Sequence, residues 1–142
     1  TDQPGRIVVF GAINDVDACH AALRRWLARR AAEALPPWLE RVADQCGQQP
    51  AAVAIKNQRT RWGSCAASGR ISLNCKLLFL PRELVRYVMV HELCHLVEPN
   101  HSHRFWAHVR ALERGADARH GQMRDAWKLV PTWAQPPLRL EL

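Results

Sequence analysis

The sequence predicts an α+β fold with a long N-terminal helix, a small antiparallel β-hairpin or sheet and a buried helix in the second half of the chain. Three observations favour this class. Apolar residues recur at three- and four-residue spacing in the first third of the chain, apolar and polar residues alternate in the middle, and a long apolar run without glycine follows. The first pattern is typical of an amphipathic helix, the second of strands and the third of a buried helix.

Length and composition favour one compact domain over residues 1–142. The chain has 142 residues, and 48% of them are hydrophobic, which is enough for a substantial core. It contains no apolar run of about 18 residues that could cross a bilayer, and its first residues lack the basic start of a signal peptide. Its five cysteines are scattered without a C-x-x-C pair, so a disulfide framework is not expected. We therefore expect a soluble, cytoplasmic protein with no membrane partner.

The charge of the chain raises the question of a nucleic-acid partner. Its formal net charge of +7 favours acidic partners, nucleic acid included. Arg24, Arg25, Arg29 and Arg30 lie between the apolar positions of the first helix and give it a basic outer face. This face is either a solvated surface or a docking surface, and no nucleic-acid-binding motif accompanies it.

The first expected elements are a short strand and the long helix. The run GRIVVFG is rich in β-forming residues between two glycines, and Asn14 or Asp15 then offers an N-cap. Pro36 and Pro37 predict a kink or a break in the helix, after which the helical period resumes. The positions expected on its inner face are Leu23, Trp26, Leu27, Ala31, Ala34 and Leu35.

Strands are expected after Gly47, which is a plausible C-cap of the helix. AVAIKNQ and TRWGSC alternate as strands do, AASGR is a turn, and ISLNCK alternates again. The last two strands are close enough in sequence to form a hairpin.

Two further helices are expected before an irregular tail. In LPRELVRYVMVHELCHLV, Pro81 suits the first helical turn and the apolar residues that follow predict a buried helix. Ser102 can cap the next helix and Gly115 can end it. The residues after Gly115 have weak periodicity, and VPTWAQPPLRLEL is expected to be extended. The positions expected to face inward on the second of these helices are Phe105, Trp106, Val109 and Leu112.

The buried helix carries a chemical motif, because His91, Glu92 and His95 form H-E-x-x-H. Residues four apart lie about 40° apart around a helix, so both imidazoles point to one side and can hold one Zn²⁺. Glu92 is placed to act on a metal-activated water as general base without binding the metal. Cys94 points away from the histidine face and is expected in the core. The motif therefore predicts zinc-dependent hydrolysis.

A catalytic zinc needs a third protein ligand, and Glu98, His101 and Glu113 are the candidates. Glu98 lies a turn beyond the point between the two histidines, and Pro99 biases it out of the helix. His101 follows the turn-forming pair Pro99 and Asn100, so the chain can reverse and bring its imidazole back to the metal. We favour His101, with Glu113 on the next helix as the second choice.

Five other residues are candidates for contacts with substrate or for orienting the ligands, namely Arg61, Trp62, Asn74, Tyr87 and His103. Tyr87 lies about one turn before His91 and His103 is close in sequence to the third ligand, so either is a candidate to stabilise the oxyanion. The alternative is that these residues serve packing and solvation alone.

The remaining histidines carry no such prediction. A lone histidine is usually a satisfied core or surface residue, and His20 and His120 have no expected partners.

A family resemblance rests on a specific set of segments between about residues 57 and 109. In this order and with short gaps, they resemble the YgjP-like metallopeptidase-domain family of small bacterial zincins, and more distantly the SprT-like and WLM proteases. The segments are RTRWGSC, GRISLN and YVMVHELCHLVEPNHSHRFW.

The resemblance implies a zincin-like, minigluzincin-type fold. It also implies one zinc held by His91, His95 and His101, with Glu92 as catalytic base. It places the hairpin beside the active-site helix, where a strand edge can pair with an extended peptide.

We therefore expect a zinc metallopeptidase that acts on a peptide or protein substrate. Two other classes remain open at this point. One is a DNA-associated protease or nucleic-acid-docking module, and the other is a zinc-stabilised interaction domain without turnover.

Overall fold

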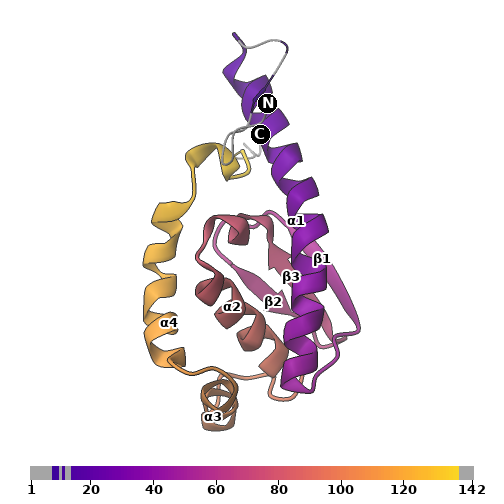
Figure 1. The fold of residues 1–142 in the computed structure, drawn as a ribbon, viewed down its shortest axis with the longest axis vertical. Coiled ribbons are helices and arrows are strands. Elements are labelled where there is room, and N and C mark those ends of the chain that lie inside the picture. Colours follow the sequence, from indigo (N-terminus) through magenta and orange to yellow (C-terminus); the bar gives the residue numbers. More distant parts are fainter. Residues whose placement is uncertain (1–7, 10, 12–13, 138–142) are drawn as a thin grey trace, which may run out of the picture.

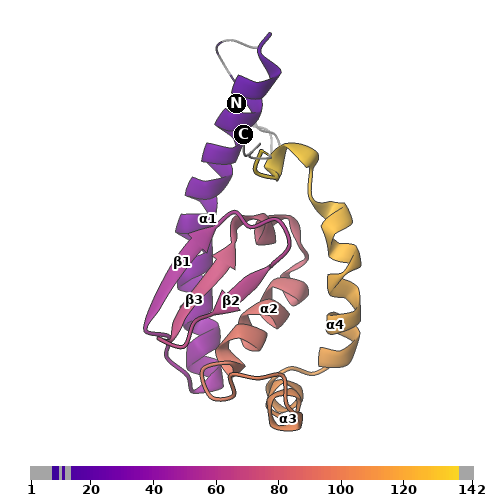
Figure 2. The same ribbon diagram turned by 180° about the vertical axis from the view of Figure 1, so that it is seen from behind.

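The structure is a computed structural model that describes residues 8–9, 11 and 14–137, so most of the predicted strand GRIVVFG lies outside it. A three-stranded sheet is covered on one face by α1 and α2, while α3 and α4 flank α2 (Figures 1 and 2). None of the helices formed by these residues is long and apolar enough to cross a membrane. In chain order the elements are α1 (Val16–Cys46), β1 (Ala52–Lys56), β2 (Gly63–Cys65), β3 (Arg70–Asn74), η1 (Cys75–Phe79), α2 (Arg82–Cys94), α3 (His103–Leu112), α4 (Ala116–Met123), η2 (Asp125–Leu129) and η3 (Thr132–Ala134).

Helix α1 has the two caps that the sequence predicts. The Asp15 carboxylate accepts a hydrogen bond of 3.0 Å from the backbone N–H of Ala18, which satisfies one free donor of the first turn. Gly47 adopts the left-handed conformation, with φ of 67°, and ends the helix. The buried face of α1 consists of Leu27, Ala31, Leu35, Leu39, Val42 and Ala43.

Of the kink or break predicted at Pro36 and Pro37, the break is absent, because α1 continues through both prolines. A proline inside a helix costs about 3 kcal/mol, since it removes a backbone hydrogen bond and crowds the preceding turn. Leu35 and Leu39 are fully buried on either side of the pair. Burial of one such side chain contributes about 1.5–3 kcal/mol, so the continuous buried face offsets much of the cost.

The sheet has the strand order β1-β3-β2 and is mixed. The predicted hairpin is present, since β2 and β3 pair antiparallel with Ser64 opposite Ser72. Strand β1 pairs with β3 in parallel, with Val53 opposite Ile71, so the expectation of a purely antiparallel sheet is wrong. Strands β1 and β2 are the two edge strands, and β2 contacts α2.

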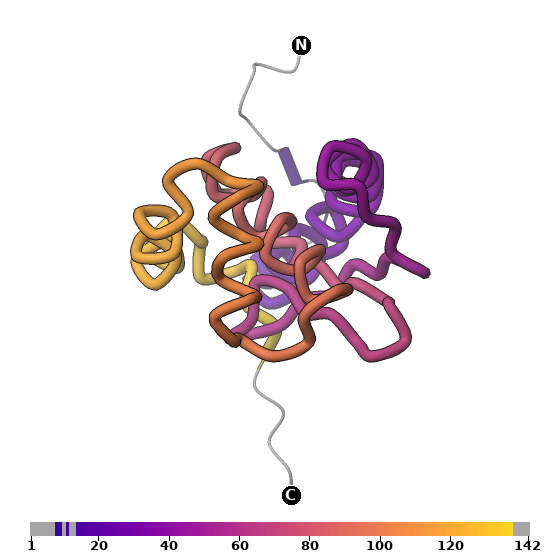
Figure 3. The backbone as a smooth tube through the Cα atoms, turned by 90° about the horizontal axis from the view of Figure 1, so that it is seen from below, coloured from indigo at the N-terminus to yellow at the C-terminus, as the bar shows by residue number. Residues whose placement is uncertain are grey.

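Helix α3 starts as predicted and ends earlier than predicted. Ser102 accepts a hydrogen bond of 3.3 Å from the N–H of Phe105, whose side chain is fully buried. The helix stops at Leu112, and Gly115, with φ of 75°, instead begins α4. In a view from below, α3 lies between α4 on one side and α1 on the other (Figure 3).

The C-terminal segment is more structured than predicted, because it forms α4, η2 and η3. It returns to α1 (Figure 1), where the Arg24 guanidinium donates to the carbonyl oxygen of Trp133 at 3.1 Å. The buried Lys76 ammonium donates to Gln135 Oε1 at 2.7 Å. These partners are distant in sequence, which explains why a local pattern did not reveal the segment.

Candidate metal centre

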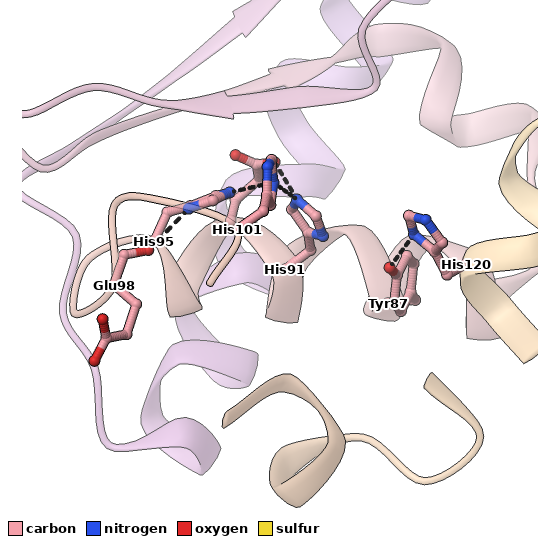
Figure 4. A network of polar contacts seen from close by, with 7 residues as sticks. Tyr87, His91, His95, Glu98, His101 and His120 are labelled. Carbon is pink, nitrogen blue, oxygen red and sulfur yellow. Dashed lines mark hydrogen bonds and ion pairs between the residues drawn. The ribbon is translucent and has the colours of Figure 1, made fainter. Parts of the chain in front are cut away.

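Three imidazoles converge at the end of α2 (Figure 4). His91 lies in the last turn of the helix, and His95 is its C-cap residue. The chain then turns through Pro99 and Asn100 and brings His101 back. Its Nε2 atom lies 3.1 Å from Nε2 of His95 and 3.3 Å from Nε2 of His91. The structure thus brings the three predicted ligands together.

A backbone contact fixes the orientation of His95. Its Nδ1 atom lies 3.0 Å from the carbonyl oxygen of Glu98, so Nδ1 carries the proton and donates it. The lone pair of Nε2 then faces the other two histidines, as a metal ligand requires. The Glu98 carboxylate points away from the cluster (Figure 4), so Glu98 contributes through its backbone.

The three nitrogen atoms fit a zinc ion. Two ligands at about 2.1 Å from a tetrahedral zinc lie about 3.4 Å apart, close to the separations of the Nε2 atoms. The ligand atoms of His91, His95 and His101 all lie within 4.8 Å of one another. No other group of three or more potential metal ligands in the described part of the chain is this close together. Three converging imidazole acceptors are stabilised by a shared cation.

Aromatic residues of α3 support the histidines. Phe105 stacks on the His95 ring, with centroids 4.3 Å apart, and meets the edges of His91 and His101. Trp106 stacks on His101 at 5.7 Å. Packing against a buried ring leaves each imidazole few alternative rotamers, so the cluster is held in place before a metal binds.

Glu92 lies beside the cluster in a tight position between helix and sheet. Glu92 is only 6% exposed to solvent. Its Oε1 atom lies 3.8 Å from Nε2 of His91. A Cβ at Gly63 of β2 would lie 3.1 Å from Glu92 Cγ, so any larger residue here would press on the Glu92 side chain. Burial raises the pKa of the Glu92 carboxyl to about 7, and the positive charge of Arg61 opposes that rise.

The pKa values of His91 and His95 are lowered, opposite to that of Glu92. Burial, reinforced by His95, His101 and His120, lowers the pKa of His91 from 6.5 to about 3. Burial also lowers the pKa of His95, against a hydrogen bond to Glu98 that favours the charged form. Both imidazoles are therefore neutral near pH 7, which is the form that binds a metal.

These shifts predict an unusual acid response of the metal-free protein. Protonation of His91 favours the unfolded chain, so His91 destabilises the fold as the pH falls below 6.5. Glu92 has a raised pKa, so its penalty for folding is lost as the pH falls from about 7 to 4.5. Between these values the two effects oppose each other, each with a limiting slope of about 1.4 kcal/mol per pH unit.

Urea unfolding of the metal-free protein across this range is the measurement. Between about pH 6.5 and 4.5 we expect the free energy of unfolding to fall more steeply with falling pH in Glu92→Gln than in wild type, because His91 and His95 destabilise both proteins there and Glu92 offsets part of the loss only in wild type. Glu98→Gln, the matched control, should follow wild type. Identical profiles for Glu92→Gln and wild type would show that Glu92 does not titrate in this way.

The alternative third ligand is engaged elsewhere. A carboxylate oxygen of Glu113 accepts from Arg86 Nε at 2.8 Å, and the pair is partly buried. Glu113 lies at the C-cap of α3, and it does not belong to the group of converging ligand atoms among the described residues.

Two cavities adjoin the cluster and share His91, Glu92, Arg61 and Gly63. One has a volume of about 190 Å³, and the other about 380 Å³. The smaller is further lined by Trp62, Tyr87, Val88, His120 and Met123, and the larger by Ser64, Cys65, His95, Pro99 and His101.

The other predicted site residues divide into two groups. Arg61, Trp62 and Tyr87 line the smaller cavity. Asn74 is fully buried and its amide donates to the carbonyl oxygens of Gln58, at 2.7 Å, and of Arg61, at 2.8 Å. Asn74 therefore shapes the loop that carries Arg61. His103 is exposed at the start of α3 and has no polar or ring contact with the cluster in the described structure.

Sequence reasoning missed two residues, of which His120 lines the smaller cavity and Trp127 lies behind its wall. The expectation that His120 has no partner is wrong, because its Nδ1 lies 2.8 Å from the Tyr87 hydroxyl. Burial raises the pKa of Tyr87 to about 12. Trp127 stacks on Trp62, with centroids 3.8 Å apart, and so supports the cavity wall. Nothing local in the sequence marks either His120 or Trp127, since the tail reaches the site only through tertiary packing.

A small α+β domain with a three-histidine cluster beside a buried glutamate has the features of a metallopeptidase site. The model of a family described as "YgjP-like, metallopeptidase domain" matches residues 3–126. The chain belongs to this YgjP-like metallopeptidase-domain family, as the sequence resemblance indicated.

A solved structure supports the assignment. The chain resembles the crystal structure of the metallopeptidase zymogen of Pyrococcus abyssi abylysin, with a TM-score of 0.54 and 30% sequence identity. The similarity covers 64% of this chain and 90% of that one. A comparison with curated proteins gave no match. Family and neighbour agree on a peptidase that uses a metal.

A nucleic-acid partner is not supported by these comparisons. Two arginines of the basic face of α1 also have partners within the chain, since Arg24 contacts Trp133 and Arg30 pairs with Glu33 at 3.2 Å. Only Arg30 of the two is paired with a negative charge among the described residues.

Proposed function

We propose that the protein is a zinc-dependent peptidase in which His91, His95 and His101 hold the metal and Glu92 is the general base. The observation that carries the proposal is the convergence of three Nε2 atoms beside a buried carboxylate, at the meeting point of two cavities. A zinc ion in this position would polarise the scissile carbonyl group and make a water molecule more acidic.

Glu92 would carry out both proton transfers of the reaction. Its carboxylate accepts one proton from the water as the water oxygen bonds to the carbonyl carbon. When the carbon–nitrogen bond breaks, Glu92 returns that proton to the leaving nitrogen, so the products are a carboxylic acid and an amine. A raised pKa near 7 suits both steps at neutral pH, because the group accepts and releases a proton with little free-energy change.

The edge strand β2 is suited to bind the substrate. Its residues Gly63, Ser64 and Cys65 line the larger cavity opposite the histidines. An extended peptide that pairs with this edge would lie across the cluster, with its backbone held by hydrogen bonds. The smaller cavity, with Trp62, Val88 and Met123 in its wall, would receive an apolar side chain next to the scissile bond.

The number of histidines favours catalysis over a purely structural zinc. Structural zinc sites usually have four protein ligands, whereas catalytic ones have three and leave a position for water or substrate. The group among the described residues has three members.

A mixture of peptides incubated with the zinc-loaded protein and analysed by mass spectrometry tests the proposal. We expect cleavage that stops when a chelator is added and returns with zinc, with apolar residues enriched beside the cleaved bonds. Intact peptides after prolonged incubation with fully zinc-loaded protein would contradict the proposal.

A further inference from the structure

His120 lies outside the H-E-x-x-H helix, yet it occupies the same cavity as the proposed base. It comes from α4 and lines the smaller cavity together with His91 and Glu92. The residue is exposed, so its ring can meet a bound substrate.

Two neighbours hold the ring of His120 in place. The Tyr87 hydroxyl, from α2, lies 2.8 Å from its Nδ1 (Figure 4). Trp106, from α3, meets the ring edge to face with centroids 4.9 Å apart. Trp106 also stacks on His101, so one side chain contacts both the metal cluster and His120. Three helices thus fix the position of His120 relative to the cluster.

The hydrogen bond to Tyr87 selects the tautomer of His120. Tyr87 is 2% exposed, and in the described structure its hydroxyl has Nδ1 of His120 as its polar partner. If Nδ1 carried the proton, the hydroxyl hydrogen of Tyr87 would be buried without an acceptor, which costs about 1–3 kcal/mol. Tyr87 therefore donates to Nδ1, and the proton of the neutral imidazole resides on Nε2. Nε2–H has no hydrogen-bond partner among the described residues and is the donor that can meet a substrate.

We propose that His120 is a further catalytic residue, whose Nε2–H donates a hydrogen bond to the oxygen of the scissile carbonyl as negative charge develops on it. Tyr87 is its positioning residue. The inference rests on the proposed peptidase function. A fixed neutral donor aimed at a developing oxyanion is worth about 10²–10³ in kcat, because it needs no reorganisation in the transition state.

Kinetics of variants test this role on a peptide that wild type cleaves. For His120→Ala we expect kcat to fall by about 10²-fold, with KM changed by less than about threefold and the zinc content unchanged. His120→Gln, which retains a donor, should recover part of the loss and serves if His120→Ala fails to fold. His108→Ala, which removes a histidine of α3, is the matched control and should match wild type.

Binding of a phosphinic peptide gives a readout apart from turnover, because its tetrahedral centre resembles the transition state. We expect calorimetry to show that His120→Ala weakens this inhibitor by about the factor lost in kcat. For Tyr87→Phe, ¹⁵N NMR of the imidazole should show a mixture of tautomers in place of the single Nε2–H form.

Failure of the proposed peptidase function and failure of the proposed role of His120 would give different results. Wild type without chelator-sensitive cleavage would overturn the proposed function. If wild type is active and His120→Ala has the same kcat and the same inhibitor affinity as wild type, only the role of His120 is overturned. Loss of zinc from His120→Ala would overturn that role as well.

Discussion

Glu92→Gln should abolish peptide hydrolysis while the protein keeps one zinc per chain. General base catalysis by a positioned side chain contributes about 10²–10⁴-fold, and the amide cannot accept the proton of the attacking water. The substitution is nearly isosteric, which matters because the Glu92 side chain is buried and packs close to Gly63 of β2. Steady-state hydrolysis of the best peptide, together with zinc analysis of the same sample, is the measurement.

Glu98→Gln is the matched control for this prediction. It makes the same chemical change in a nearby glutamate whose carboxylate points away from the histidines (Figure 4). We expect it to retain wild-type activity, because Glu98 orients His95 through its backbone carbonyl oxygen. Residual activity of a tenth or more in Glu92→Gln would show that another group is the base.

His101→Ala should lose zinc, and with it activity. Loss of an outer partner of a zinc ligand costs about 10- to 100-fold in metal affinity, and loss of a ligand should cost more. Glu113→Ala is the comparison, since Glu113 was the competing candidate and instead pairs with Arg86. That variant should keep its zinc, although loss of the partly buried partner of Arg86 should cost about 1–3 kcal/mol of stability. Zinc affinity is measured by competition with a chromogenic chelator.

The reverse pattern would contradict the assignment. Zinc bound tightly by His101→Ala but lost from Glu113→Ala would make the site one of two histidines and a glutamate.

The predictable part of this site is the part encoded by local spacing. His91 and His95 meet because helical geometry places residues four apart on one face. His101 follows from Pro99 and Asn100, which favour a turn after the helix. The cluster in the structure has the composition that these local rules predict.

The unpredicted part depends on contacts between distant segments. His120 reaches Tyr87 only because α4 packs against α2, and weak periodicity in the tail gave no sign of that helix. The parallel pairing of β1 with β3 is likewise non-local. Helix α1 continues through Pro36 and Pro37 because its buried face continues, which overrides the local preference of proline.

Zinc content, measured by elemental mass spectrometry on the purified protein and on His91→Ala, shows whether the three histidines hold a metal. His91 is the most enclosed of the three histidines and contacts the other two. We predict one zinc per chain in wild type and none in the variant. Absence of metal from wild type after zinc has been offered and the excess removed, or equal zinc in both proteins, would contradict the account.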